Sequence, residues 1–393
     1  MSLMDKELGR RQLLGGLGLL SFGTSCVSIN PLKPMFDYKG LKSLGPLQRA
    51  DSHGISLPKK YSSRVLAESG YKVIKGSGSE TNYKWHQAPD GGACIPAKDG
   101  GWVYTSNSEI KETGGAGALR FDANGQLIDA YSILKNTNRN CAGGPTPWNT
   151  WLSCEEVVGG KVYECDIYGK GSQLRKGLGS FQHEAVAIDP INMQAYLTED
   201  EVDGCFYRYT PSAITNGVMD LDNGTLEAAK LDSNGKISWL PIANPNPEKQ
   251  GLETRYQQKE ATKFSGGEGI WHHEGQVFFT SKGDNRVWRY DIRSKSLGIV
   301  YEQKSSKNGI LSGVDNVTVS SDGHILVAED GGDMQIVVIG PFGDIYPLLQ
   351  IQDQDHSEIT GPAIAPTRDR LYFSSQRGGR LNHGITYEIL GNF

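Results

Sequence analysis

Acidic residues at the ends of short apolar runs are the residues of this sequence that could do chemistry. Each run ends in a small polar residue and, in most copies, an acid, and the six copies read VYTSNSE, WLSCEE, AYLTED, VFFTSK, ILVAED and LYFSSQ. The packing of strands against one another does not require acids at these positions. Many carboxylates can share one place only when cations neutralise them. The pattern therefore predicts a metal site.

The candidate ligands are these acids, the polar groups that stand upstream of each run, and one thiol that stands at the same upstream position of its run. Cys141 lies in the segment NCAGGPTPW, at a Gly-rich entry to a strand, and is the thiol that we expect to bind metal. Oxygen-rich sites favour calcium, whereas a lone thiolate among carboxylates favours a transition metal such as iron. The predicted metal ligands are Cys141, Glu155, Glu156, Glu184, Glu268, Asn107, Glu109, Glu199, Asp200, Asp315, Asn316, Glu329 and Asp330, and Asp90 belongs to the same convergent set.

The spacing of the six copies indicates the elements that position these ligands. The matching positions are separated by 48, 44, 82, 48 and 46 residues, and they are Asn107, Glu155, Glu199, Ser281, Glu329 and Ser375. A period in the forties that is built from strands is typical of propeller blades. The long interval fits one blade plus an insertion around residues 205–260. We predict an all-β, six-bladed β-propeller over residues 81–393, with residues 31–80 leading into it or closing it.

Composition agrees with an all-β chain. The sequence holds 50 glycines, many of them in Asp-Gly-Gly turns that join short antiparallel strands. No long stretch shows the 3.6-residue apolar period of a helix. The net charge of −5 and the lack of a basic cluster argue against nucleic acid as a partner. We expect a monomer that acts on a small molecule.

The first 30 residues are predicted to be a targeting segment. Arg10 and Arg11 stand just before a short apolar run, as in a twin-arginine export signal, and the run is too short to span a bilayer. Cys26 resembles the cysteine of a lipoprotein cleavage site, although Gly23 stands where Leu is usual. We therefore expect the export machinery as a partner and a periplasmic or extracellular location, with membrane contact only if Cys26 is lipidated.

Five cysteines follow Cys26, and an odd number leaves at least one thiol free or bound to metal. If Gly159 and Gly160 form a two-residue hairpin turn, Cys154 faces Cys165 across two strands. The pair then forms either a disulfide or two reduced core residues, and the sequence favours neither.

The segment NCAGGPTPW followed by Glu155 and Glu156 resembles the signature of PhoX-type alkaline phosphatases. The resemblance implies a six-bladed propeller, twin-arginine export, hydrolysis of phosphate monoesters, and a cofactor of two oxide-bridged ferric ions with two or three calcium ions. It favours Cys141, Glu155, Glu156, Glu184 and Glu268 as ligands, with Asn107 and Glu109 next. Weaker matches follow in the family's order over roughly residues 85–380, and they are Asn107-Ser108-Glu109, His183-Glu184, Thr198-Glu199-Asp200, Glu268, Asp315-Asn316, Glu329-Asp330-Gly331, Thr360-Gly361-Pro362 and Gln376.

Two departures bear on activity. Ser108 stands where the family has His, and Gly266 stands where it commonly has a phosphate-binding Arg. Phosphoryl transfer needs positive charge on the non-bridging oxygens, and Lys282 or Arg286 is the candidate catalytic cation here. We expect weak phosphatase activity that Gly266→Arg raises. A calcium-dependent lactonase-type hydrolase, which makes no use of Cys141, and a non-catalytic metal-stabilised binding propeller remain open as alternatives.

Overall fold

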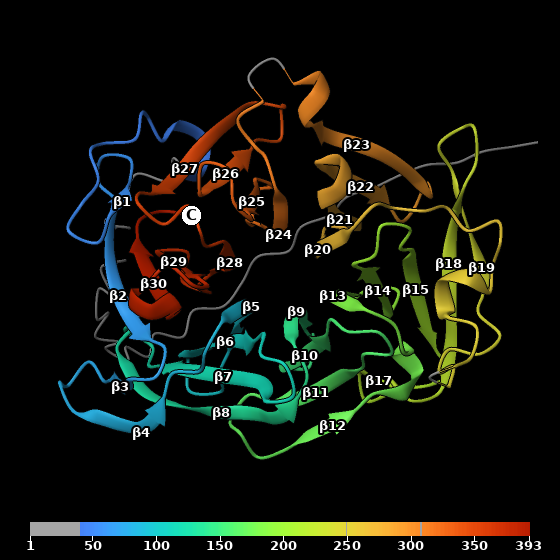
Figure 1. The fold of residues 1–393 in the computed structure, drawn as a ribbon, viewed down its shortest axis with the longest axis horizontal. Coiled ribbons are helices and arrows are strands. Elements are labelled where there is room, and N and C mark those ends of the chain that lie inside the picture. The colour runs from blue at the N-terminus through green and yellow to red at the C-terminus, as the bar shows by residue number, and fades with distance from the viewer. Residues whose placement is uncertain (1–39, 249, 307–308) are drawn as a thin grey trace, which may run out of the picture. The chain divides into compact units, whose positions relative to one another are not determined.

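The computed structural model describes residues 40–248, 250–306 and 309–393. In this part of the chain, six antiparallel sheets of four or five strands surround a common axis, as the blades of a β-propeller do (Figure 1). The predicted fold class is confirmed. No described helix is long and apolar enough to cross a membrane. The predicted leader and Cys26 lie outside the described residues.

Each blade is an antiparallel meander whose first strand is nearest the axis. Blade one contains β5 (Pro89–Pro96), β6 (Trp102–Ser108), β7 (Gly114–Phe121) and β8 (Leu127–Thr137). Blade two contains β9 (Asn140–Pro145), β10 (Thr150–Glu155), β11 (Val162–Asp166) and β12 (Ser172–Leu174). Blade three contains β13 (His183–Asp189), β14 (Gln194–Glu199), β15 (Phe206–Pro211), β18 (Gly224–Leu231) and β19 (Ile237–Pro241).

The remaining blades follow the same plan. Blade four contains β20 (Gly267–His273), β21 (Gln276–Ser281), β22 (Arg286–Asp291) and β23 (Ser296–Glu302). Blade five contains β24 (Val314–Val319), β25 (Ile325–Glu329), β26 (Gln335–Ile339) and β27 (Ile345–Ile351). Blade six contains β28 (Ile359–Ile364), β29 (Arg370–Ser375) and β30 (Ile385–Leu390). The described 3-10 helices are η1 (Gly40–Ser43), η2 (Lys176–Leu178), η3 (Thr254–Tyr256), η4 (Lys282–Asp284), η5 (Gln303–Ser305) and η6 (Arg380–Asn382).

Residues before blade one complete the last two blades. Strand β2 (Ser62–Glu68) pairs antiparallel with β30 as the outermost strand of blade six, and β1 (Ile55–Ser56) pairs with β27 in blade five. A hairpin of β3 (Lys72–Ile74) and β4 (Glu80–Lys84) then leads into blade one. The pairing of an N-terminal strand with the last sheet closes the circle of blades, because it ties the two ends of the propeller together.

The predicted insertion belongs to blade three. A hairpin of β16 (Ile214–Thr215) and β17 (Val218–Met219) stands between β15 and β18, and β19 adds a fifth strand. The segment between β19 and β20 carries η3. These additions account for the long interval between the second strand of blade three, β14, and the second strand of blade four, β21. The second strands of the other blades keep the spacing read from the sequence.

Apolar side chains of neighbouring blades pack face to face, which is why the second strands are buried along their whole length. Phe206 of blade three stacks on Phe279 of blade four with ring centroids 4.6 Å apart, and Tyr290 and Trp288 join the same cluster. Aromatic pairs of this kind add to the free energy gained from burial. The blades are thereby held in fixed positions, and with them the strand ends at the axis.

Every inner strand carries one extra residue near its start. His183 pairs opposite Glu199, yet Val186 pairs opposite Leu197, so three residues of β13 match two of β14. The other five blades show the same shift. A β-bulge breaks the ladder locally and redirects a side chain. In five blades the bulge includes the second residue of the inner strand, and in blade six it directly follows that residue, Thr360.

Small residues follow the bulges because the inner strands converge there. A Cβ atom added to Gly91 would lie 2.5 Å from the Cα of Ala142, and one added to Gly269 would lie 2.7 Å from the Cα of Asn316. All six inner strands line a cavity of about 20 Å³ on the axis. That volume is barely enough for one water molecule. The inner strands therefore leave little room between them at this level.

Candidate active site

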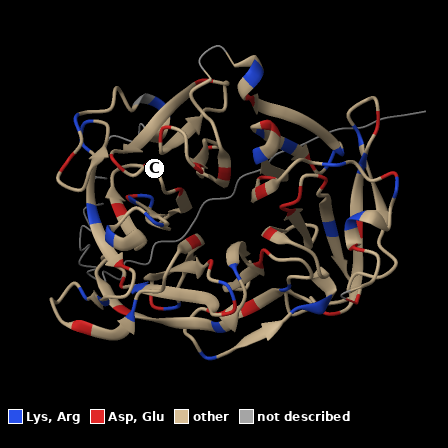
Figure 2. Cartoon of the chain, in the orientation of Figure 1, with Lys and Arg blue, Asp and Glu red and all other residues tan. Residues whose placement is uncertain are grey.

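Two sets of polar side chains surround the axis at the strand ends. The inner ring is the second residue of each inner strand, and its members are Asp90, Cys141, Glu184, Glu268, Asp315 and Thr360. The outer ring is the residue after each second strand, and its members are Glu109, Glu156, Asp200, Lys282, Asp330 and Gln376. Acidic residues accordingly gather on the axial ends of the blades (Figure 2).

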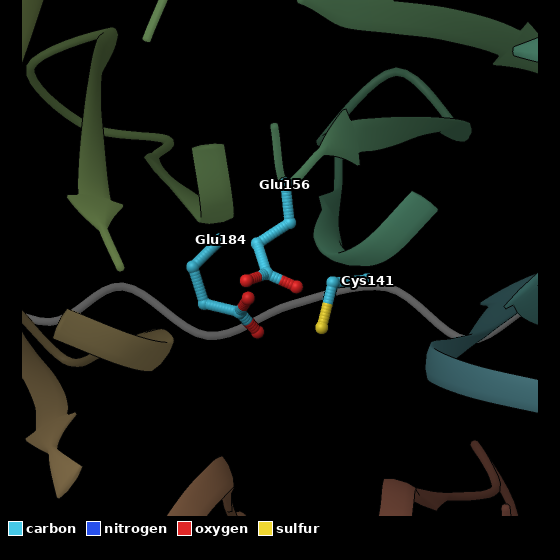
Figure 3. Close-up of side chains that lie close together, drawn as sticks. All are labelled: Cys141, Glu156 and Glu184. Atoms are coloured by element: carbon cyan, nitrogen blue, oxygen red, sulfur yellow. The ribbon is translucent and has the colours of Figure 1, made fainter. Parts of the chain in front are cut away.

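Cys141, Glu156 and Glu184 form the part of the rings that we call the thiol corner. Their ligand atoms lie within 4.8 Å of one another, and the three side chains point toward one another from β9, the end of β10 and β13 (Figure 3). Both carboxylate oxygens of Glu184 are buried and have no hydrogen-bond partner among the described residues. A buried carboxylate without a partner is costly. A metal ion bound by these three side chains would remove that cost, so the donor set fits a metal.

The electrostatics of the thiol corner favour a bound cation. Burial raises the pKa of Glu184, and the charge of Glu268 raises it further. Burial and the charge of Asp90 likewise raise the pKa of the Cys141 thiol. Burial and the neighbouring Asp200 raise the pKa of Glu156 to about 8. Without a cation these groups hold their protons, and a cation would favour the ionised forms that bind metal.

A lysine stands among the acids on the blade-four side, which we call the lysine corner. The Nζ atom of Lys282 lies 3.1 Å from Glu268 Oε1, 3.0 Å from Asp315 Oδ2 and 3.0 Å from Asp330 Oδ2. Burial alone would lower the pKa of Lys282, but the charges of these three acids outweigh it and raise the pKa. Lys282 is therefore a permanent cation of the outer ring.

An arginine holds the acids on the blade-six side. Arg377 donates to Glu109 Oε2 at 2.8 Å and to Glu358 Oε1 at 2.9 Å, and its side chain is 41% exposed. Glu109, Glu358 and Asp90 form a further group whose oxygens could hold a metal ion. Burial raises the pKa of Glu358 to about 8, and the charge of Asp315 adds to the shift. We call Arg377 and these three acids the arginine corner, and through the exposed Arg377 it reaches the solvent.

Sequence reasoning missed two of these residues as site members. Glu358 directly precedes inner strand β28, and Arg377 is the second residue after β29. A signal for Glu358 existed, since it is the polar residue upstream of the last apolar run. Arg377 had no signal, because no other blade carries a cation at that position.

Several predicted ligands lie outside the clustered groups and stabilise loops. Glu199 accepts hydrogen bonds from Tyr207 Oη at 2.7 Å and from the Cys205 amide at 3.1 Å, and Arg255 pairs with it. Glu329 accepts from the amides of Ser312 and Gln335. Glu155 accepts from the Asn138 amide. These acids end the second strands and face the loops, so their hydrogen-bonding oxygens are already satisfied by the protein.

The two predicted amide ligands are also occupied by protein groups. Asn107 donates to the carbonyl of Ala142 at 2.7 Å and accepts from Trp151 Nε1 at 2.9 Å. Asn316 donates to Asp315 and accepts from the Gly361 amide at 2.7 Å. Both therefore fix the inner strands against one another. Asn107 lies outside the clustered groups, whereas Asn316 holds one oxygen of a clustered acid.

The two candidate catalytic cations lie in different places. Lys282 is in the outer ring, as described. Arg286 pairs with Asp284 at 2.8 Å and with Glu302, and its guanidinium lies over the ring of Trp288. The structure therefore brings Lys282, and not Arg286, to the clustered acids.

The cysteine pair of blade two shows a wrong prediction of register. Cys154 pairs opposite Val162, and Cys165 pairs opposite Trp151. The reason is that the turn runs from residue 156 to 161 and is not a two-residue turn at Gly159 and Gly160. Cys154 and Cys165 are free, buried thiols. Of the two alternatives, the reduced core residues are the correct one.

Comparison with known proteins agrees with this geometry. A sequence profile of the family described as alkaline phosphatase PhoX matches residues 103–174 and 162–379, which is well over half of the chain. The chain belongs to the PhoX alkaline phosphatase family. PhoX membership identifies it as an enzyme of the phosphatase class. The family resemblance predicted from the sequence is confirmed. A comparison with curated proteins found no match.

Solved structures share the propeller. The structure of Pseudomonas fluorescens PhoX in complex with vanadate, a transition state analogue, matches with a TM-score of 0.68 at 16% identity, covering 88% of this chain and 97% of that chain. A Bacteroides thetaiotaomicron protein of unknown function matches with a TM-score of 0.51 at 7% identity, covering 85% and 78%. The calcium-binding protein regucalcin from Agrobacterium tumefaciens matches with a TM-score of 0.47 at 13% identity, covering 78% and 92%. The two matches with TM-scores above 0.5 show a shared fold, and at these identities they show the fold alone.

Proposed function

We propose that this protein hydrolyses phosphate monoesters at a metal centre held by the two rings. The observation that carries the proposal is the pair of unpartnered, buried oxygens of Glu184 beside Cys141 and Glu156. Membership in the PhoX family supports the reaction class, and the Pseudomonas relative that shares the fold binds a transition state analogue.

The donor atoms indicate which metal belongs where. Cys141 offers the one sulfur in the clustered groups, which favours iron at the thiol corner. Asp90, Glu109 and Glu358 offer oxygens only, which favours calcium at the arginine corner. When bound, such ions supply positive charge to the phosphoryl oxygens and activate the attacking nucleophile.

The residues of the chain itself would position the substrate and orient the ring carboxylates. Because the inner strands leave little room between them, a substrate would approach from the exposed side of the rings. Arg377 is a cation that reaches solvent at this edge, and its guanidinium matches the oxygens of a phosphate geometrically. Lys282, held by three acids, keeps part of the ring neutral. Gln376 donates to Asp90 and to Glu109, which orients both carboxylates.

Export is part of the same proposal. The paired Arg10 and Arg11 before an apolar run support passage through the twin-arginine route, which carries folded proteins with their cofactors in place. The protein would then act in the periplasm or outside the cell, and lipidation of Cys26 would anchor it to a membrane.

The test is hydrolysis of an aryl phosphate by protein purified from its native export route, with iron and calcium measured in the same sample. We expect both metals and a phosphatase activity that chelation removes. Glu184→Gln keeps the volume of the side chain but removes its charge, and should lose metal and activity together. Glu227→Gln, which alters an ion pair with Arg208 on the outer part of blade three, is the control. Metal-loaded protein that cleaves a lactone and no phosphate ester would contradict the proposal.

A further inference from the structure

The outer ring has one member that breaks its pattern. Five of its six residues are acids or an amide, and blade four alone contributes a cation, Lys282. Its side chain is 34% exposed, whereas those of Glu268 and Asp315 are 2% and 5% exposed. The ammonium group thus lies at the entrance of a buried oxygen cluster and closes it.

Two of the clustered acid groups adjoin this ammonium. One is Glu184, Glu268 and Asp315, and the other is Asp315, Asp330 and Glu358, so the two share Asp315. Lys282 contacts Asp315 and one further acid of each group, at 3.0 to 3.1 Å. These oxygens would otherwise suit a hard divalent cation such as calcium. A charged nitrogen in contact with three carboxylate oxygens supplies the same neutralisation from within the chain.

The other two groups differ in this respect. The thiol corner has no lysine or arginine in contact with Cys141, Glu156 or Glu184 among the described ion pairs. Its Glu184 oxygens have no partner in the described part of the chain. At the arginine corner, Arg377 contacts Glu109 and Glu358, and Arg139 lies 4.0 Å from Glu109, but no cation contacts Asp90 among the described residues. The lysine corner is therefore the part of the described rings in which a single cation of the chain contacts three acids at once.

We propose that the ammonium of Lys282 occupies one cation position of the ring, so that this protein binds one divalent ion fewer than the acids around the axis could hold. The inference rests on the proposed metal centre but not on its reaction. It assigns Lys282 as a permanent substitute for a calcium ion among Glu268, Asp315 and Asp330.

The local backbone explains how the lysine reaches this position. The amide of Lys282 donates to the Gly266 carbonyl at 2.8 Å, and the amide of Gly283 donates to the Ser265 carbonyl at 2.9 Å. These bonds fix η4 against the start of β20. The Cα of Lys282 is thereby held beside Glu268, and the flexible stem carries the ammonium to the acids of blade five.

The experiment counts calcium ions. Wild type, Lys282→Met and Arg286→Gln are stripped with a chelator and titrated with Ca²⁺ by calorimetry, with bound calcium measured by elemental analysis. Met keeps the length of the side chain and removes the charge, and Arg286 lies on the same turn with its partners outside the rings. We expect Lys282→Met to bind one more Ca²⁺ per chain than wild type, and to gain more thermal stability from calcium. Arg286→Gln should bind as wild type does.

Equal calcium stoichiometry in wild type and Lys282→Met would overturn the inference. If Lys282→Met does not fold without metal, a crystal of wild type grown with excess calcium decides the question. A metal peak in contact with Glu268, Asp315 and Asp330 would overturn the inference, and an ammonium there without metal would support it. Neither readout measures hydrolysis, so an inactive wild type would contradict the proposed function and leave this inference standing.

Discussion

The backbone amide of Lys282 donates a hydrogen bond to the carbonyl of Gly266 at 2.8 Å. The cation of the outer ring therefore stands beside the position at which the family resemblance implies a phosphate-binding arginine. Gly266 has φ +65°, and a Cβ atom added there would lie 3.2 Å from Asp200 Oδ1. The residue that replaces the expected arginine and the lysine of the ring are therefore hydrogen-bonded neighbours, and the glycine has a positive φ that a residue with a side chain rarely adopts.

Gly266→Arg tests this relationship. A positive φ costs a residue with a side chain on the order of 1–2 kcal/mol, so the variant should be less stable than wild type. Gly266→Ala carries the same backbone cost without the charge and is the matched control. We expect kcat/KM on an aryl phosphate to be roughly 10- to 100-fold higher for Arg than for Ala, because a charge-assisted phosphoryl contact is worth up to about 3 kcal/mol. Equal values for the two variants would show that the position does not face the substrate.

If the thiol corner binds iron as proposed, Cys141→Ser should remove the charge-transfer colour of the thiolate-bound iron, and with it most of the iron. The reason is that, among the described residues, Cys141 is the one thiol whose sulfur lies within 4.8 Å of two clustered acids. Cys154→Ser is the control, since that thiol is buried in an apolar cluster of blades two and three. Visible absorption and iron content of the two purified variants provide the measurement. Equal bleaching in both would mean that the ligand has been misassigned.

Metal-free protein should become less stable as the pH rises from about 5 to about 8. Burial raises the pKa of Glu156 and of Glu358 from 4.5 to about 8, so the folded state binds more protons than the unfolded state in this window. Stability falls with pH wherever the folded state holds the extra protons. Urea unfolding of the chelated protein at several pH values measures the effect. A midpoint that rises with pH would contradict it, and added metal should weaken the fall because it favours the ionised acids.

The number of blades and the position of the ring were predictable, because strands repeat at a fixed interval and each inner strand carries a polar residue or a thiol at its second position. The assignment of individual acids was less predictable. Glu155, Glu199 and Glu329 end their strands as expected, yet their oxygens accept hydrogen bonds from backbone amides of loops. The next residue in each blade reaches the ring instead. A shift of one residue reverses the direction of a strand side chain, and periodicity alone does not fix it.

The bulges explain the rest of the difference. The extra residue in β13 lies within the bulge that includes Glu184, so alternation along this strand does not by itself give the direction of the Glu184 side chain. The cations were the hardest to place from the sequence. Lys282 and Arg286 lie on one turn, and only the fold shows that the first meets three acids while the second pairs with Glu302. Contacts between blades depend on residues far apart in the chain, which a local pattern does not report.

Glu184→Gln and Glu329→Gln should therefore change stability and metal content in opposite ways. Glu184 has no hydrogen-bond partner among the described residues, so metal-free Glu184→Gln should be at least as stable as wild type and should bind less metal. Each oxygen of Glu329 accepts one backbone amide, and the new NH₂ group would leave one of those amides without an acceptor. That loss costs about 1–3 kcal/mol, while the metal content should stay unchanged. Urea unfolding of the chelated variants and elemental analysis of the untreated ones give both quantities. If Glu329→Gln loses metal and keeps its stability, the division between ring acids and loop-holding acids is wrong.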